Sequence, residues 1–306
     1  MKRFGLIGHP IAHSLSPALF KAGYEGRYPY DLIETADFEE AYRRFLEGYD
    51  GINVTAPFKE LAYGKADILS EECKVVKATN LLVRTPEGIK AFNSDFLGVR
   101  LWLEETFGEL SGDITDSKRT PPTSWAPPPA ARGVARFSPS VISPDNQPKG
   151  LNPTTLVVGL GGAGKAAAVA AASLNLDVIL MNRNLDRAER LAEDLGHLGH
   201  MTEIRPLGDF CRCFREADII IYNIPTAIPQ LNMLKEEDFA SGKPKLILEA
   251  NYKDPSFNKD LLAIMEKANP QAHYTGGRTW LLYQAMTGYE IFTGENPDLA
   301  KMSAAL

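Results

Sequence analysis

The segment Thr154-Thr155-Leu156-Val157-Val158-Gly159-Leu160-Gly161-Gly162-Ala163-Gly164 decides the fold of half of this chain. Its first five residues form an apolar, β-branched run that is typical of a strand buried on both faces of a parallel sheet. The glycines that follow have the spacing G-x-G-x-x-G, and an alanine-rich helix begins directly after them. This order predicts a Rossmann-type domain that binds the pyrophosphate of a dinucleotide; a helix start packed for its own sake is the alternative. The predicted cofactor contacts in the loop are Gly159, Gly161, Gly162, Ala163 and Gly164.

The residues beyond the helix indicate which dinucleotide is bound. Asp177–Met181 has the pattern of a second strand, Asn182 and Arg183 stand at its tip, and Arg187 follows one helical turn later. An NAD site places a carboxylate at this tip to bind the ribose 2′-hydroxyl, whereas guanidinium groups bind a 2′-phosphate. We therefore predict NADP, with Asn182, Arg183 and Arg187 as contacts. Ordinary solvent-facing charges are the alternative for the two arginines.

Strand and helix patterns also alternate through the first hundred residues. Candidate strands are Phe4–Ile7, Tyr30–Glu34, Gly51–Thr55, Leu81–Arg84 and Ile89–Ala91, and candidate helices are Pro17–Tyr24, Phe38–Leu46, Phe58–Lys65 and Asn93–Phe107. Alternating units with short connections predict a mostly parallel sheet covered by helices. The chain is therefore expected to be an α/β protein of two domains, an N-terminal substrate domain and a Rossmann-type NADP-binding domain, with the active site in the cleft between them.

A proline-rich segment separates the two halves. Residues 111–150 contain eight of the 21 prolines and few aliphatic side chains. Because loops of this length are rare inside compact domains, we predict a flexible insertion at a domain boundary. A proline-rich ligand for a partner protein is the alternative. The expected domains are 1–110 and 151–271, the first completed by C-terminal helices over 272–306, with no strand from Tyr274 onward.

Composition limits the class of protein. The 306 residues are 44% hydrophobic and carry a net charge of −6, which is typical of a soluble globular protein and argues against a nucleic-acid partner. No apolar run is long enough for a membrane span or a signal peptide. The three cysteines, an odd number, are expected to be unpaired thiols of a cytoplasmic protein. Neither they nor His197 and His200 form a metal-ligand set, so no metal is predicted.

Three polar clusters follow candidate strands in the first half, where parallel sheets bind ligands. The first holds Ser14 and Ser16, the second holds Lys59, and the third holds Asp95. An enzyme that reduces a ketone needs a proton donor beside the carbonyl and a group that orients this donor. Taken singly, each has a simpler explanation: helix N-capping for the serines, a surface position for Lys59 and a helix-dipole contact for Asp95.

Together these clusters resemble the shikimate dehydrogenase family. Gly8–Pro17 is similar to that family's G-x-P-x-x-H-S-x-S-P opening, Gly51–Lys59 to its G-x-N-V-T-x-P-x-K motif, and Asn93–Asp95 to its N-T-D. Asn182-Arg183 resembles its N-R-T cofactor motif, and Gly277–Ala285 resembles its terminal G-x-x-x-L-x-x-Q-A. The motifs keep their order from the first strand to the C-terminal helices, leaving out the insertion.

The resemblance implies an activity and a set of residues. The family reversibly reduces 3-dehydroshikimate to shikimate with NADPH in aromatic amino-acid (chorismate) biosynthesis, and acts as a monomer or homodimer without a nucleic-acid or membrane partner. By resemblance, Lys59 and Asp95 form the catalytic pair that moves the proton at the C3 oxygen. The implied substrate contacts are Ser14, Ser16, Thr55, Asn80, Asp95, Tyr252 and Gln284, and Asn223 and Gly277 join the cofactor contacts.

Several positions depart from the family pattern. Phe20-Lys21 replaces His-Asn, Leu81 replaces a threonine and Phe96 replaces a glycine. Asn223–Ile228 matches only loosely the N-x-T-P-x-G-M loop beside the nicotinamide. Two alternatives therefore stay open: an enzyme of broader range that also acts on quinate and, from another class, a non-catalytic NADP-binding regulatory protein.

Overall fold

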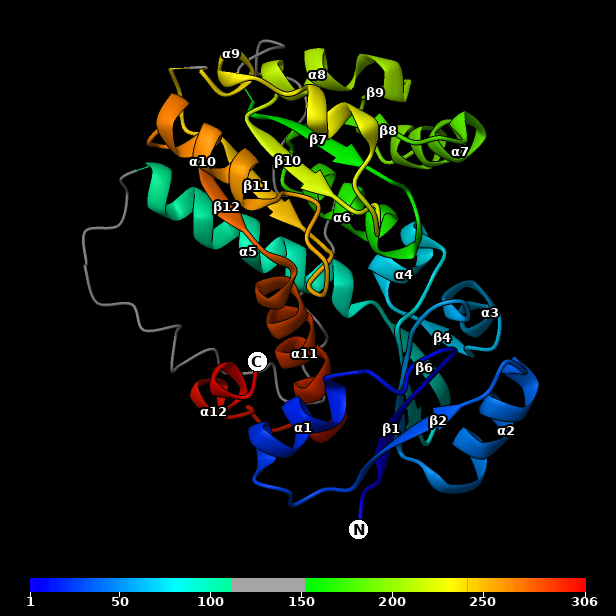
Figure 1. The fold of residues 1–306 in the computed structure, drawn as a ribbon. Helices are drawn as coiled ribbons and strands as arrows, with labels where there is room; N and C mark the ends of the chain where they lie inside the picture. The colour runs from blue at the N-terminus through cyan, green and yellow to red at the C-terminus, as the bar shows by residue number, and fades with distance from the viewer. Residues whose placement is uncertain (112–151, 241) are drawn as a thin grey trace. The chain divides into compact units, whose positions relative to one another are not determined.

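The computed structural model describes residues 1–111, 152–240 and 242–306 (Figure 1). The predicted proline-rich insertion, apart from Ser111, lies outside the described residues. The described chain divides into two compact units, residues 1–98 with 282–306 and residues 99–110 with 152–281. The division falls within the helices α5 (Ser94–Ser111) and α11 (Gly277–Thr293), so each of these helices contributes residues to both units.

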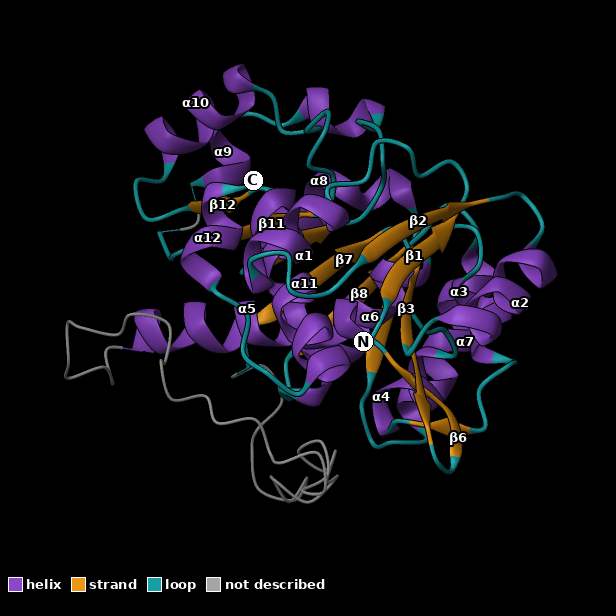
Figure 2. Cartoon of the chain, turned by 90° about the horizontal axis from the view of Figure 1, so that it is seen from below, coloured by secondary structure: helices purple, strands orange, loops and turns teal. Residues whose placement is uncertain are grey.

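The first unit is built on a sheet with the strand order β2-β1-β3-β5-β6-β4. Strands β2, β1 and β3 are parallel neighbours and lie side by side in Figure 2. Helix α2 packs on β1 and β2, and the C-terminal helix α12 packs on α1. Besides parts of α5 and α11, its elements are β1 (Phe4–Gly8), α1 (Ser16–Tyr24), β2 (Tyr30–Glu34), α2 (Phe38–Gly48), β3 (Gly51–Val54), α3 (Lys59–Tyr63), β4 (Ile68–Leu69), α4 (Glu71–Val76), β5 (Leu81–Thr85), β6 (Gly88–Phe92) and α12 (Leu299–Ala304).

This sheet is mostly parallel, as expected, with β5 as its antiparallel strand. β5 pairs antiparallel with both β3 and β6, whereas β1–β2, β1–β3 and β4–β6 are parallel pairs. Only Pro86 and Glu87 separate β5 from β6, and a two-residue link allows a hairpin but not a crossover helix. The elements β4 and α4 were not predicted, because two and six residues are too few to show a hydrophobic period.

The second unit is a doubly wound parallel sheet with the order β12-β11-β10-β7-β8-β9, the order of a Rossmann fold. The predicted fold class is therefore confirmed. Its elements are β7 (Thr154–Val158), α6 (Gly162–Ser173), β8 (Asp177–Met181), α7 (Leu185–Gly196), β9 (Thr202–Arg205), η1 (Leu207–Asp209), α8 (Phe210–Glu216), β10 (Ile219–Tyr222), η2 (Pro229–Met233), α9 (Glu236–Phe239), β11 (Leu246–Glu249), α10 (Lys259–Ala268) and β12 (His273–Thr275).

The expectation of no strand from Tyr274 onward is wrong. Residues His273–Thr275 form the edge strand β12, which pairs in parallel with β11. Three residues show no alternation that sequence reasoning can use, and the strand exists because β11 offers it a hydrogen-bonding partner.

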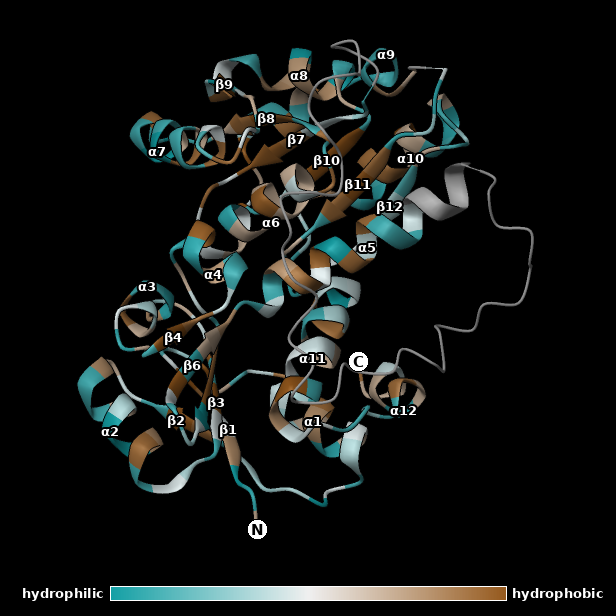
Figure 3. Cartoon of the chain, turned by 180° about the vertical axis from the view of Figure 1, so that it is seen from behind, coloured by the Kyte–Doolittle hydropathy of each residue, from teal (hydrophilic) through white to brown (hydrophobic). Residues whose placement is uncertain are grey.

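The core of the second unit follows from its apolar strands. Every residue of β10 and β11 is buried, and β7, β10 and β11 carry the hydrophobic colour in Figure 3. Side chains of this size each contribute about 1.5–3 kcal/mol when fully buried. On α6 the run Ala166–Ala172 is buried, and its small side chains let the helix pack closely on β7 and β10. This close packing sets the position of the glycine loop that precedes the helix.

The first unit contains a buried carboxyl group that forms no ion pair with another described residue. Glu290 on α11 is 5% exposed, and its Oε1 has no hydrogen-bond partner among the described residues. Burial raises the pKa of Glu290 from 4.5 to about 7. Its neighbour Tyr24 on α1 also has a raised pKa, caused first by burial and to a smaller extent by Glu290. The folded state therefore prefers the protonated form of Glu290.

This preference makes stability depend on pH in a defined direction. Because the folded pKa lies above the unfolded one, the contribution of Glu290 is fully present below pH 4.5 and is lost as the pH rises through about 7. We expect Glu290→Gln to raise the free energy of unfolding by about 1–3 kcal/mol at pH 8 and to change it little at pH 4.5. Urea titrations at the two pH values measure this difference. Glu87→Gln, at an exposed position of the β5–β6 turn, is the control. An equal effect of Glu290→Gln at both pH values would contradict the prediction.

Candidate functional site

The ends of four strands define one edge of the first sheet. The parallel neighbours β1 and β3 end at Gly8 and Val54. β5 runs antiparallel to β3 with Leu81 opposite Asn53, so β5 begins where β3 ends. β6 in turn ends at Phe92, opposite Leu81. All three polar clusters predicted from the sequence therefore start at this edge.

Lys59 and Asp95 form an ion pair at this edge. Lys59 begins α3, and Asp95 lies in the first turn of α5. Their side chains are 17% and 5% exposed, so the pair is largely shielded from water. A surface position, the alternative for Lys59, does not fit this burial. In this arrangement an ammonium group can donate a proton while a carboxylate orients it.

Asn80 and Ser94 join the two chain segments beside the ion pair. Nδ2 of Asn80 donates to Oγ of Ser94 at 3.0 Å, and the backbone N of Ser94 donates to Oδ1 of Asn80 at 2.7 Å. Asn80 is buried and uses part of its side-chain amide in this way. The amide group retains a second hydrogen for a further partner.

Ser14 and Ser16 form a half-buried hydroxyl pair at the start of α1. Oγ of Ser14 donates to Oγ of Ser16 at 3.1 Å and accepts from the backbone N of Ser16 at 3.2 Å. The N-cap residue of α1 is Leu15, and no side chain caps the helix, so the N-capping alternative for the serines is wrong. The hydroxyl of Tyr289 donates to the carbonyl oxygen of Ser16 at 3.0 Å, which ties this loop to α11.

Thr55 and Gln284 each lie against a glycine, whose missing side chain lets the two segments come close together. A Cβ on Gly8 would lie 2.4 Å from Cγ2 of Thr55, and a Cβ on Gly98 would lie 2.8 Å from the backbone N of Gln284. The second contact brings α11 directly against α5. All the predicted substrate contacts except Tyr252 therefore belong to the first unit.

In the second unit β7 runs into the glycine loop and then into α6, whose N-cap is Gly161. Gly159 has a φ of 87°, a conformation that favours glycine. A Cβ on Gly164 would lie 1.8 Å from the carbonyl oxygen of Gly159, whereas one on Gly161 would meet nothing within 4 Å. Gly162 and Ala163 form the first turn of α6. The helix start thus offers N–H groups beside open space, an arrangement that fits a pyrophosphate.

Two asparagines flank the glycine loop. Oδ1 of Asn182 accepts from the backbone N of Leu160 at 3.1 Å, so Asn182 orders the loop. Asn223 follows β10, and a Cβ on Gly164 would lie 3.4 Å from its Nδ2. Its buried Oδ1 has no hydrogen-bond partner among the described residues. Because buried acceptors are rarely left unpaired, this atom supports the assignment of Asn223 to a ligand site.

Arg183 and Arg187 lie beyond the tip of β8, before and within the first turn of α7. Both side chains are exposed, and neither forms an ion pair with another described residue. Two unpaired guanidinium groups four residues apart fit a phosphate group, which carries about two negative charges at neutral pH. The residues of this unit therefore fit NADP.

The segment after β11 carries Tyr252, whose half-buried side chain has a pKa raised by burial. Nδ2 of Asn251 donates to the carbonyl oxygen of Pro225 at 2.9 Å, so this segment holds the loop after β10 that departs from the family pattern. A Cβ on Gly277 would lie 2.5 Å from the carbonyl oxygen of Ala250. This close packing leaves no room for a side chain at the start of α11.

The sequence did not indicate two buried polar residues, Glu72 and Thr79, that bond to the segments carrying the ion pair. Glu72 lies on α4, and the backbone N of Thr79, in the loop after it, donates to the carbonyl oxygen of Lys59 at 3.0 Å. No spacing in the sequence marks them, because they belong to a short helix and its loop. Only the contacts show that they belong to the site.

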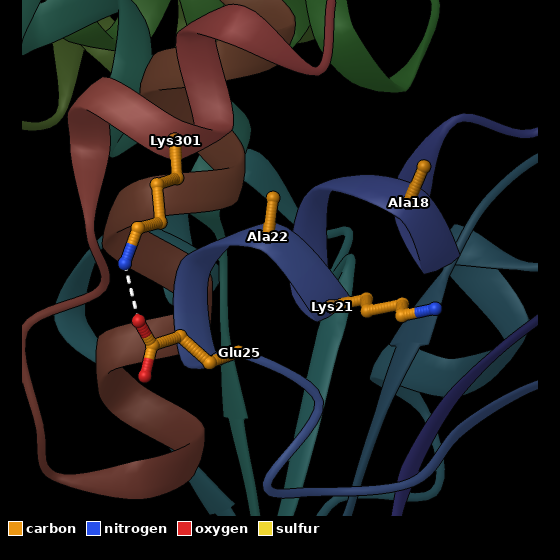
Figure 4. Close-up of a pocket in the computed structure, with 5 residues that line it drawn as sticks. All are labelled: Ala18, Lys21, Ala22, Glu25 and Lys301. Carbon is orange, nitrogen blue, oxygen red and sulfur yellow. Dashed lines mark hydrogen bonds and ion pairs between the residues drawn. The ribbon is translucent and has the colours of Figure 1, made fainter.

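A pocket of about 450 Å³ lies elsewhere, on α1 and α12 (Figure 4). It is lined by Ala18, Lys21, Ala22, Glu25 and Lys301, and Lys301 forms an ion pair with Glu25. None of the predicted site residues lines it.

In residues 1–111, 152–240 and 242–306, no group of three or more His, Cys, Asp or Glu residues is arranged to hold a metal ion. Nor does this part of the chain contain a helix long and apolar enough to cross a membrane.

The mixed α/β unit with its shielded ion pair and the doubly wound unit with its glycine loop define a class, the two-part α/β proteins with a Rossmann-type dinucleotide-binding fold. Two family models match the chain, the shikimate dehydrogenase substrate binding domain over residues 6–82 and shikimate / quinate 5-dehydrogenase over residues 147–248. Together they span more than half of the sequence. This chain belongs to the shikimate dehydrogenase family, which confirms the resemblance seen in its motifs.

Individual relatives agree over the full length. The shikimate dehydrogenase (NADP(+)) of Carboxydothermus hydrogenoformans is 26% identical over 314 residues, which cover 100% of this chain and 96% of that protein. The crystal structure of Mycobacterium tuberculosis shikimate dehydrogenase aligns with a TM-score of 0.72 at 26% identity, covering 100% of this chain and 98% of its own. Shikimate 5-dehydrogenase from Thermus thermophilus, solved in complex with shikimate, aligns with a TM-score of 0.69 at 26% identity, covering 100% and 97%.

Proposed function

We propose that this chain is an NADP-dependent shikimate dehydrogenase. It interconverts 3-dehydroshikimate and shikimate in aromatic amino-acid (chorismate) biosynthesis, as an oxidoreductase acting on a CH–OH group. The observation that carries the proposal is the shielded ion pair of Lys59 and Asp95 at the sheet edge. Lys59 also lies within the residues that match a substrate binding domain of this family. A regulatory protein that only binds NADP has no need of such a pair.

Lys59 handles the proton of the reaction. In the direction of reduction its ammonium group donates a proton to the C3 oxygen as the ketone becomes an alcohol, and in oxidation the neutral amine takes that proton back. NADPH, when bound, supplies the hydride for C3. Asp95 accepts a hydrogen bond from Nζ of Lys59 and thereby fixes the direction in which the ammonium group points.

The other polar side chains suit the functional groups of the substrate. A carboxylate is bound by hydroxyl donors, and ring hydroxyls both donate and accept hydrogen bonds. We assign the substrate carboxylate to Ser14, Ser16 and Tyr252, and the ring hydroxyls to Thr55, Asn80, Asp95 and Gln284. We further assign the cofactor to Gly159, Gly161, Gly162, Ala163, Gly164, Asn182, Arg183, Arg187, Asn223 and Gly277.

A substrate and cofactor panel tests the function. Initial rates of NAD(P)H formation are followed at 340 nm with shikimate and with quinate, each with NADP+ and with NAD+. We expect the highest kcat/KM for shikimate with NADP+, since the free guanidinium groups favour the 2′-phosphate. If kcat/KM is higher for quinate than for shikimate, the chain is instead the enzyme of broader substrate range that also acts on quinate. Binding of NADP+ without turnover of either compound would replace it by the regulatory protein.

The proposal also covers the domain organisation, the cellular compartment and the oligomeric state of the enzyme. We assign substrate binding mainly to the first unit and cofactor binding mainly to the second. This is close to the expected division into 1–110 with 272–306 and 151–271, but residues 99–110 and 272–281 belong to the second unit. We place the enzyme in the cytoplasm as a monomer or homodimer. Three free cysteines, two of them buried, support a reducing compartment. Fractionation of cells and light scattering of the purified protein test these two assignments.

A further inference from the structure

Glu72 is a buried carboxylate that the proposed mechanism does not use. It lies on α4 and is 3% exposed. Within the described chain no lysine, arginine or histidine forms an ion pair with it. Burial raises the pKa of its carboxyl group, and hydrogen bonds oppose this rise in part. A buried carboxylate without a cation is costly, so its presence calls for a structural or functional reason.

The hydrogen bonds of Glu72 lead to the start of α5. Its Oε1 accepts from Oγ of Ser70 at 2.5 Å and from the backbone N of Asn93 at 3.2 Å. The same oxygen therefore connects the N-cap residue of α4 with the residue directly before α5. Asp95 lies only two residues further along the chain.

Asn93 is fixed on three sides. Besides its backbone bond to Glu72, its Nδ2 donates to the carbonyl oxygen of Ala78 at 3.0 Å, and its Oδ1 accepts from the backbone N of Phe96 at 3.0 Å. The last bond closes the first turn of α5, the turn that contains Asp95. Glu72 thus sets the point at which this turn begins.

The loop between α4 and β5 connects this turn to Lys59. The backbone N of Thr79 donates to the carbonyl oxygen of Lys59, and Asn80 bonds to Ser94 in both directions. Residues 78–80 therefore bond both to Lys59 and to Asn93 and Ser94, the two residues that precede Asp95. Loss of the Glu72 contact leaves Lys59 held by Thr79 but removes the acceptor that holds the backbone N of Asn93, two residues before Asp95.

We infer that Glu72 is a positioning residue for the reaction, whose acceptor oxygen holds the first turn of α5 so that Asp95 faces Lys59. The inference rests on the proposed function of the ion pair. We attribute this positioning to the hydrogen-bond acceptor of Glu72 and not to its negative charge, because the bonds from Ser70 and Asn93 both end on one oxygen.

Three variants of the full chain test the inference, assayed with shikimate and NADP+. Glu72→Gln keeps an acceptor at the same place and is expected to retain kcat within about three-fold, whereas Glu72→Ala is expected to lower kcat about ten-fold. The KM for NADP+ is expected to stay unchanged in both, because the second unit carries the cofactor residues. Glu71→Ala is the matched control, since Glu71 is the exposed neighbour that pairs with Lys74.

Amide hydrogen exchange adds a readout that does not depend on activity. Glu72→Ala is expected to speed exchange at the amides of Asn93 and Phe96, relative to Glu71→Ala. If the wild type oxidises no substrate, the proposed function fails, and exchange alone then decides whether Glu72 holds this turn. If Glu72→Ala does not fold, Glu72→Asp, which withdraws the oxygen by one methylene group, carries the same expectations.

Equal kcat values in Glu72→Ala and Glu71→Ala would overturn the inference. An equal loss of kcat in Glu72→Ala and Glu72→Gln would also overturn it, because charge and not the acceptor would then be responsible. A lower Tm of Glu72→Ala without any change in kcat or in hydrogen exchange at Asn93 would likewise overturn the inference.

Discussion

Replacing Lys59 by alanine is expected to lower kcat for shikimate oxidation by about three orders of magnitude and to leave the affinity for NADP+ unchanged. A positioned general acid or base contributes roughly 10²- to 10⁴-fold, and Lys59 is the ammonium group that faces Asp95 in the shielded pair. Alanine leaves Asp95 buried without its cation, so part of the change reflects a disturbed site. Rates at saturating shikimate and fluorescence titration with NADPH measure the two quantities.

Lys65→Ala provides the control for this variant. Lys65 lies just beyond α3 and pairs with Glu39 on the surface, so its loss is expected to leave kcat unchanged. If Lys59→Ala retains kcat within about three-fold of the wild type, Lys59 is not the group that moves the proton. If the wild type itself is inactive while NADPH binds, the regulatory alternative replaces the enzyme.

The double variant Arg183→Ala/Arg187→Ala is expected to raise the KM for NADP+ by about ten- to one hundred-fold. Each charge-assisted hydrogen bond to a phosphate contributes roughly 1.5–3 kcal/mol, and 1.4 kcal/mol corresponds to a factor of ten. The kcat/KM for NAD+, which has no 2′-phosphate, is expected to change by less than about two-fold. Both guanidinium groups are exposed and unpaired within the described chain, so their removal breaks no internal ion pair.

Arg212→Ala is the control for the loss of charge in the same unit. Arg212 pairs with Asp209 at the start of α8 and has no predicted cofactor contact. An unchanged KM for NADP+ would show that the two arginines are ordinary surface charges. An equal change in KM for NADP+ and NAD+ would show that they do not act through the 2′-phosphate. A wild-type preference for NAD+ would contradict the cofactor assignment itself.

The sequence contained the Rossmann unit almost completely. A buried strand, a glycine loop and a small-residue helix each have a local signature, since β-branched runs, G-x-G-x-x-G spacing and alanine content follow from the conformation of a few consecutive residues. The motifs around Lys59 and Asp95 were equally visible. The short elements β4, α4 and β12 were not, because two to six residues carry too little periodicity to be recognised.

The tertiary structure alone decided how distant residues meet. Lys59 and Asp95 are 36 positions apart, and they meet because β3, β5 and β6 bring their ends to one edge through antiparallel pairing. The role of Glu72 depends on the same arrangement, since its partner Asn93 lies 21 positions away. By itself the sequence determined the fold class, the cofactor loop and the family, because these depend on local conformation and residue type. Strand register and buried hydrogen bonds, which set the geometry of the ion pair, arise only when separate segments pack together.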